Sequence, residues 1–77
     1  MTDITTRLIT LSGKHFGVET IGFTAESDFF DSLGIDSLKA LELLSELEME
    51  FDVEIPDYEL QGVKTFGQLA EKIEERV

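Results

Sequence analysis

Residues 34–51, GIDSLKALELLSELEMEF, decide the fold of this chain. Leucine, alanine and glutamate dominate the stretch, and all three have high helix propensity. Asp36 stands where an N-cap is expected, and apolar residues follow it at helical spacing. The pattern predicts a helix from Ser37 to Phe51, the clearest element in the sequence.

This helix carries two apolar stripes when residues are placed at about 100° per position. The first is an ordinary core stripe and comprises Ala40, Leu43, Leu44, Leu47 and Phe51. The second lies on nearly the opposite side, between Glu42 and Glu48, and comprises Leu38, Leu41, Ser45 and Met49. If the second stripe is exposed, it suits docking to an apolar groove with a basic rim. Alternatively, the helix is central and is covered on both sides.

Ser37 stands at the start of the same helix. A helix start has free backbone N–H groups and the positive end of the macrodipole, so an anionic group is stabilised there. Asp36 can cap the helix itself, which leaves Ser37 in the first turn. We interpret Ser37 as the attachment point of a phosphate-linked prosthetic group. The alternative is a serine that only caps the helix.

The segment before this stretch predicts one helix and one long loop. Apolar residues at helical spacing indicate a helix over residues 3–16. Thr2 or Asp3 can cap its start, and Gly17 can end it. No apolar period of 2 or 3.6 holds for long over residues 17–35, so we expect a loop pinned by its own apolar side chains.

The segment after it predicts a short helix and a longer one. Pro56 stops any continuation of the central helix, and residues 57–60 can form one turn. Thr65 and Gln68 have the spacing of a capping box, which begins the last helix. The buried stripe of that helix is predicted to comprise Phe66, Leu69, Ala70, Ile73 and Val77. We expect one domain over residues 1–77.

Composition narrows the possible functions. The formal net charge is −11, so nucleic acid is an unsuitable partner, because binding phosphates needs clustered lysine and arginine. A basic protein surface suits this charge, although the charge can also serve only solubility. The chain has no cysteine, no apolar run of membrane-span length and no signal-peptide pattern at its start. These features predict a cytoplasmic protein, which we expect to be a monomer.

The sequence offers little for catalysis or metal binding. His15 is the only histidine, and no acid–base pair has a defined spacing, so we expect no enzymatic activity. Ser37 is better interpreted as the substrate of another enzyme. A calcium loop starting at Asp31 would place the apolar Leu33 at a ligand position, so no metal site is predicted. Weak divalent-ion binding along the acidic helix remains open as a charge effect.

Gly34 to Leu38 resembles the phosphopantetheine attachment site of acyl carrier proteins. The similarity extends over nearly the whole chain and includes Gly17-Val18, Phe29, Leu33-Gly34, Leu43 to Phe51 and Ile55-Pro56-Asp57. The resemblance implies an all-α fold, a small four-helix bundle with three longer helices and one short helix. It also implies a discrete carrier without catalytic activity of its own.

The resemblance further implies a cofactor and partners. A phosphopantetheinyl transferase would attach 4′-phosphopantetheine to the Ser37 hydroxyl, with Asp36 and Leu38 beside it. The thiol of this arm would carry acyl groups as thioesters. Acyl-loading and acyl-processing enzymes with basic and apolar patches would then contact Leu38, Lys39, Leu41, Glu42, Ser45, Glu48, Met49 and Ile55.

Four positions depart from carriers of primary fatty-acid synthesis. Lys39, Met49 and Tyr58 stand where those carriers usually have acids, and Ser45 replaces a bulkier apolar residue. These changes weaken the negative field, and Lys39 would face a basic patch unfavourably. We therefore hypothesise a specialised fatty-acid, polyketide or modified-lipid pathway.

Two alternatives remain. One is an aminoacyl, aryl or peptidyl carrier of a nonribosomal peptide pathway, although Asp36 before the serine favours acyl cargo. The other belongs to a different class. It is a helical adaptor that carries no arm and docks through Leu38, Leu41 and Met49.

Overall fold

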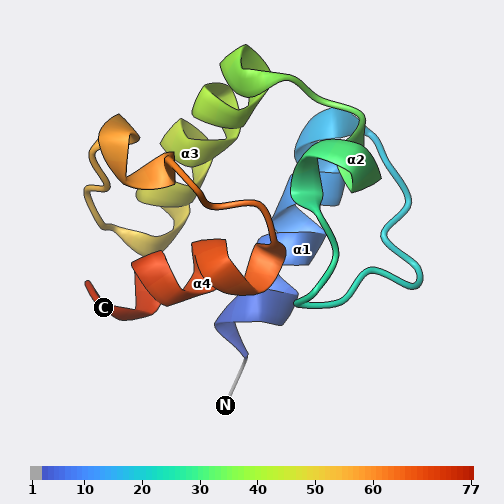
Figure 1. The fold of residues 1–77 in the computed structure, drawn as a ribbon. Coiled ribbons are helices and arrows are strands. Elements are labelled where there is room, and N and C mark those ends of the chain that lie inside the picture. Colours follow the sequence, from blue (N-terminus) through green and yellow to red (C-terminus); the bar gives the residue numbers. More distant parts are fainter. Residues whose placement is uncertain (1–2) are drawn as a thin grey trace.

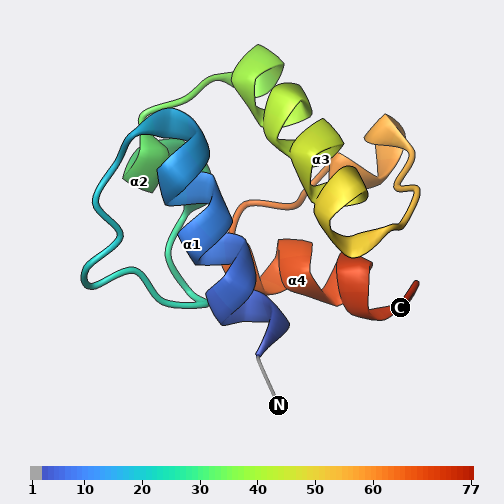
Figure 2. The same cartoon turned by 180° about the vertical axis from the view of Figure 1, so that it is seen from behind.

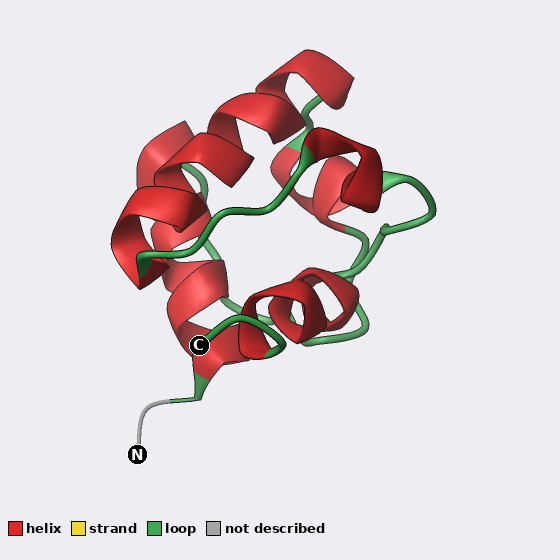
Figure 3. Cartoon of the chain, turned by 90° about the vertical axis from the view of Figure 1, so that its left-hand side faces the viewer, coloured by secondary structure: helices red, strands yellow, loops and turns green. Residues whose placement is uncertain are grey.

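The computed structural model describes residues 3–77, which form four α-helices and one 3-10 helix (Figure 1). The elements are α1 (Ile4–Phe16), α2 (Phe29–Leu33), α3 (Ser37–Phe51), η1 (Asp57–Leu60) and α4 (Phe66–Glu74). The all-α bundle with three longer helices is confirmed. In this part of the chain no strand forms (Figure 3), and no helix is long and apolar enough to cross a membrane.

Helices α1, α3 and α4 surround the main core, and α1 packs on both of the others (Figures 1 and 2). The side chains of Leu8, Leu47, Phe66 and Ile73 are fully buried at its centre. Phe29 from α2 joins them, with its ring centroid 6.0 Å from that of Phe66. Burial of this apolar surface is the dominant force that holds the helices together.

The ends of α1 are set by the residues that the sequence indicated. Of the two predicted caps, Thr2 lies outside the described residues, and the Asp3 carboxylate accepts the N–H of Thr5 at 3.3 Å. Gly17 ends the helix in the left-handed conformation, with φ of 66°, which glycine adopts without strain. Gly13 is buried, and a Cβ there would clash with the Thr20 side chain and lie only 2.7 Å from the carbonyl oxygen of Val18, so this position favours glycine.

Helix α2 was not predicted, since residues 17–35 were expected to form a loop throughout. The Asp28 carboxylate caps it by accepting the N–H groups of Phe30 at 2.8 Å and Asp31 at 3.2 Å. Phe29 and Leu33, four positions apart, are both buried on its inner side. One turn this short gains its stability from that packing rather than from propensity.

A pair of crossing hydrogen bonds ties the start of α2 to the start of α4. The N–H of Phe29 donates to the Lys64 carbonyl at 2.9 Å, and the N–H of Phe66 donates to the Ser27 carbonyl at 3.2 Å. This is the isolated bridge between Asp28 and Thr65. The link fixes α2, and therefore the loop that leads from α2 into α3.

The last helix begins as predicted but ends earlier than its stripe implied. Thr65 and Gln68 form the capping box, with the N–H of each bonded to the side chain of the other at 3.1 Å. The prediction that Val77 is buried is wrong, because its side chain is 67% exposed. Helix α4 ends at Glu74, and Arg76 folds back to donate to the carbonyl oxygens of Lys72 and Glu54, both at 2.9 Å.

Candidate functional site

The loop between α2 and α3 is short, and local hydrogen bonds fix its path. Gly34 ends α2 with φ of 67°, a left-handed conformation that favours glycine. The N–H of Ile35 donates to the Phe30 carbonyl at 3.0 Å, and the Ile35 side chain is half-buried. Asp36 then caps α3, its carboxylate accepting the N–H of Lys39 at 3.0 Å. These contacts place Ser37 in the first turn of α3, as the sequence predicted.

The Ser37 side chain is exposed and free to react. Within residues 3–77, no hydrogen bond uses its hydroxyl, and the backbone N–H groups of Ser37 and Leu38 have no acceptor. Asp36 supplies the cap, so the serine is not needed for it. Two free N–H groups at the positive end of a 15-residue helix suit a phosphate oxygen beside the hydroxyl. The residues present therefore fit a phosphate-linked group at Ser37.

A groove of about 310 Å³ opens beside Ser37, between α2, α3 and η1. Its remaining lining residues are Phe30, Ala40, Leu41, Asp57, Leu60 and Gln61. The walls from α2 and α3 are apolar, and η1 and the residue after it add one carboxylate and one amide. A group attached to the Ser37 hydroxyl thus has a mostly apolar channel next to it, with polar groups on one wall.

The second stripe of α3 is exposed, so the alternative of a helix covered on both sides is wrong. The side chains of Leu38, Leu41 and Met49 are 68%, 38% and 71% exposed, and Ser45 is exposed between them. We call these four residues the α3 face. Tyr58 on η1 is also exposed, at 67%. The α3 face begins one residue after Ser37 and extends along the helix.

Ile55 does not belong to this surface, which corrects the expectation that it contacts partners. Its side chain is only 3% exposed and lies in the core. Next to this buried side chain, the Ile55 N–H donates a hydrogen bond to the Glu48 carboxylate at 2.8 Å. This bond holds the chain after α3 against the helix. Glu48 was predicted to contact partners, but its carboxylate also makes this hydrogen bond within the fold.

Two other carboxylates of α3 form ion pairs. Glu42 lies 3.3 Å from the ammonium of Lys39, one helical turn earlier. Glu50 lies 3.0 Å from the guanidinium of Arg7 on α1, and that guanidinium also sits 4.6 Å from the centre of the Phe51 ring. The Lys39–Glu42 spacing was visible in the sequence. The Arg7–Glu50 pair had no sequence signal, because 43 positions separate its members.

The described residues show no further reactive centre. Within residues 3–77, no three histidine, cysteine, aspartate or glutamate side chains lie close enough to hold a metal ion. His15 is exposed at the end of α1, with its ring edge against Phe16 at 4.7 Å between centroids. The site therefore consists of the exposed serine, the helix start, the groove and the α3 face.

Comparison with known proteins identifies the family. A family model described as "phosphopantetheine attachment site" matches residues 6–73, nearly the whole chain. The chain belongs to this family of phosphopantetheine-binding carrier proteins. The carrier is also similar to a solved structure of the acyl carrier protein from Enterococcus faecalis, with a TM-score of 0.77 and 28% sequence identity. That match covers 100% of each chain.

Membership settles the class of function. The carrier is an acyl carrier protein whose covalent cofactor is 4′-phosphopantetheine. Carriers of this class act with a phosphopantetheinyl transferase and with acyl-processing enzymes. They are not catalytic themselves.

Proposed function

We propose that Ser37 is the residue that holds the 4′-phosphopantetheine arm, through a phosphodiester on its hydroxyl. The observation that carries this proposal is the free, exposed hydroxyl at the start of α3, next to N–H groups without acceptors. Asp36 supports it by taking the capping role. The arm supplies a thiol that holds an acyl group as a thioester.

The other residues of the site orient and shelter this position. The N–H groups of Ser37 and Leu38 can donate to phosphate oxygens, which favours the modified form. The groove lined by Leu41 and Leu60 offers apolar contact beside the attachment point, while Asp57 and Gln61 add polar groups. The carrier contributes no catalytic group in this proposal. It presents its cargo at high effective concentration to each enzyme that it meets.

We propose that the α3 face is the surface that these enzymes contact, the transferase included. Leu38, Leu41, Ser45 and Met49 are exposed beside Ser37, and Lys39 and Glu42 border them. Glu48 flanks the opposite edge, and its carboxylate accepts a hydrogen bond from the Ile55 N–H. A partner seated on this face would also lie close to the arm. We propose that the carrier acts as a cytoplasmic monomer, since copies with a net charge of −11 repel one another.

We propose that its pathway is a specialised one, making a fatty acid, a polyketide or a modified lipid. Lys39, Met49 and Tyr58 support this, because all three are exposed where a fatty-acid enzyme would meet acids. A cation and two neutral side chains on that surface would weaken attraction to a basic patch.

Arm transfer in vitro tests the attachment residue. The protein is incubated with coenzyme A and a broad-specificity phosphopantetheinyl transferase, and its intact mass is measured. The Ser45→Ala variant is a matched control, because Ser45 is the other exposed serine of α3. Wild type and Ser45→Ala should each gain one arm, and Ser37→Ala should gain none. An equal gain in Ser37→Ala would refute Ser37 as the site, and no gain in wild type would favour a helical adaptor without an arm.

A further inference from the structure

We infer that the α3 face recognises its partners mainly by apolar contact, and that the fitting partner has an apolar groove whose rim places a carboxylate opposite Lys39. This rests on the proposed function, in which the α3 face is the docking surface. It replaces the expected partner, a groove rimmed by cations.

Three of the four carboxylates of α3 already have partners within the carrier. Glu42 pairs with Lys39 at 3.3 Å, and Glu50 pairs with Arg7 at 3.0 Å. Glu48 accepts the N–H of Ile55 at 2.8 Å. A cation on a partner would have to compete with each of these contacts. The gain from a new ion pair would therefore be smaller than the count of acids on α3 indicates.

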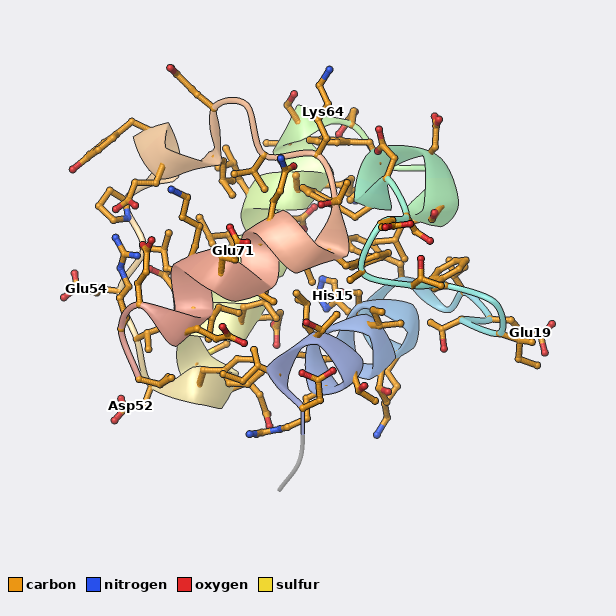
Figure 4. All side chains as sticks on the ribbon, turned by 60° about the horizontal axis from the view of Figure 1, so that its bottom comes forward. His15, Glu19, Asp52, Glu54, Lys64 and Glu71 are labelled. Carbon is orange, nitrogen blue, oxygen red and sulfur yellow. The ribbon has the colours of Figure 1, made fainter. Side chains whose placement is uncertain are left out.

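The fourth carboxylate, Glu46, stands on the Lys39 side of the helix, seven residues after Lys39. It is half-buried, and no cation pairs with it in residues 3–77. Asp52 and Glu54 follow α3 directly, at the opposite end of the helix from Lys39. Other acids lie away from α3, such as Glu19 on the loop between α1 and α2 (Figure 4). At physiological ionic strength the field of such distant charges is screened beyond about 8 Å.

The apolar part of the α3 face, in contrast, has no competing contact. Leu38 and Met49 are 68% and 71% exposed, so docking would bury most of each side chain. Burial of apolar surface contributes roughly 25 cal/mol per Å², and methionine adapts to irregular partner surfaces. Lys39 lies at the Ser37 end of this face, with its side chain half exposed. A partner cation there would be repelled, whereas a partner carboxylate could share the Lys39 ammonium with Glu42, which lies 3.3 Å from it.

Transfer kinetics with a phosphopantetheinyl transferase of known basic docking patch test the charge part. We expect Lys39→Glu to raise kcat/KM by about fivefold at low salt and by less than about twofold at high salt. Lys64→Glu is the matched control, because it makes the same change in net charge at an exposed lysine outside α3, on the loop before α4 (Figure 4). It should leave kcat/KM nearly unchanged. Equal effects of the two variants, or a lower rate for Lys39→Glu, would overturn the inference.

A charge-reversed transferase provides the converse test. Its docking cations are replaced by glutamate, one at a time, and the wild-type carrier is compared with Lys39→Glu. We expect at least one of these transferases to prefer the wild-type carrier, which reverses the order seen with the basic patch. If every charge-reversed transferase still prefers Lys39→Glu, no carboxylate suits the position opposite Lys39, and the inference fails.

The apolar part is tested by comparing two substitutions on one face. Met49→Ala should lower kcat/KM more than Glu42→Gln does, and its effect should be the same at low and high salt. A larger effect of Glu42→Gln that disappears at high salt would show that charge dominates docking. Failure of the proposed function is distinguishable, because then no variant gains an arm at Ser37. If Ser37 gains the arm but Glu42→Gln lowers kcat/KM more than Met49→Ala does, this inference fails while the proposed function stands.

Discussion

The two faces of α3 are both apolar, but the inner face is buried in the core and the outer face is exposed. Leu43 and Leu47 on the inner face are 1% and 0% exposed, whereas Leu38 and Met49 on the outer face are 68% and 71% exposed. Both faces are apolar, so helix periodicity finds both and cannot rank them. The difference comes from α1 and α4, which pack around the inner face only. One helix thus serves the core on one side and presents Ser37 and the proposed docking surface on the other.

This division implies that stability and docking respond to different residues of one helix. Truncating one side chain on each face tests whether only the inner face contributes to stability. Leu47→Ala should lower the free energy of unfolding by about 3 kcal/mol, because it leaves a cavity in a packed core. Met49→Ala should change it by less than about 0.5 kcal/mol. Urea unfolding followed by circular dichroism measures both, and similar losses would show that the outer face is also structural.

The ion cluster at the end of α4 supports η1, which forms one wall of the groove on the outer side. Arg76 donates to the Glu54 and Lys72 carbonyl oxygens and pairs with Glu59, and each member of this pair is about three-quarters buried or more. Arg76→Ala should cost about 2 kcal/mol, since it leaves the Glu59 charge without its main partner. Lys72 would remain, 3.8 Å from that carboxylate.

The same variant has a local readout. Amide hydrogen exchange should rise in η1 more than in α1, because η1 has no buried residue of its own. Glu75→Ala is the control, as Glu75 is 62% exposed and lies 3.5 Å from Arg76. If Glu75→Ala destabilises as much as Arg76→Ala, or if exchange rises uniformly, the cluster does not specifically hold η1.

Glu48 lies at the border between the two faces of α3. Its variants measure how much its hydrogen bond to the Ile55 N–H stabilises the fold. Glu48→Ala should lower the free energy of unfolding by about 1.5 kcal/mol, because the Ile55 N–H loses its acceptor. Glu48→Gln keeps an oxygen at that position, so most of the stability should return. Chemical denaturation compares the two variants. Equal losses would indicate that the charge matters and not the hydrogen bond.

Removal of the Asp36 cap beside Ser37 is expected to cause the smallest loss of stability. Asp36→Ala should cost about 1 kcal/mol, because the N–H of Lys39 loses its acceptor, while Asp36→Asn should cost only a few tenths. Thermal unfolding of both variants measures this difference. A negligible effect of Asp36→Ala would mean that Ser37 can take over the cap, which would weaken the argument that its hydroxyl is free.

Much of the fold was accessible from the sequence because local chemistry specifies it. The helix over residues 37–51, its Asp36 cap and the capping box at Thr65 rest on neighbouring residues, and the structure confirms them. Ser37 could be placed in the first turn of its helix for the same reason. Its chemical role needed the resemblance to a family, since a serine at a helix start is commonly only a cap.

The errors concern features that depend on distant parts of the chain. Helix α2 is only five residues long and is tied to Lys64 by a backbone hydrogen bond, so it is too short for a helical period to be established from the sequence. The Asp28 cap and the spacing of Phe29 and Leu33 were its only local signals. Ile55 was expected to contact partners from the family resemblance, and its burial had no local signal because its neighbouring contact, the bond to Glu48, spans seven positions. The exposure of the α3 face likewise depends on which helices pack on the other side.

Mass spectrometry of the protein isolated from its own host cells tests whether Ser37 holds the arm in the cell. Proteolytic fragments should place the 4′-phosphopantetheine arm, with or without an acyl group, on the peptide that contains Ser37. None of the other four serines should carry it, including the exposed Ser45 on the same helix. An arm on a different serine, or a protein isolated without any arm, would contradict the account.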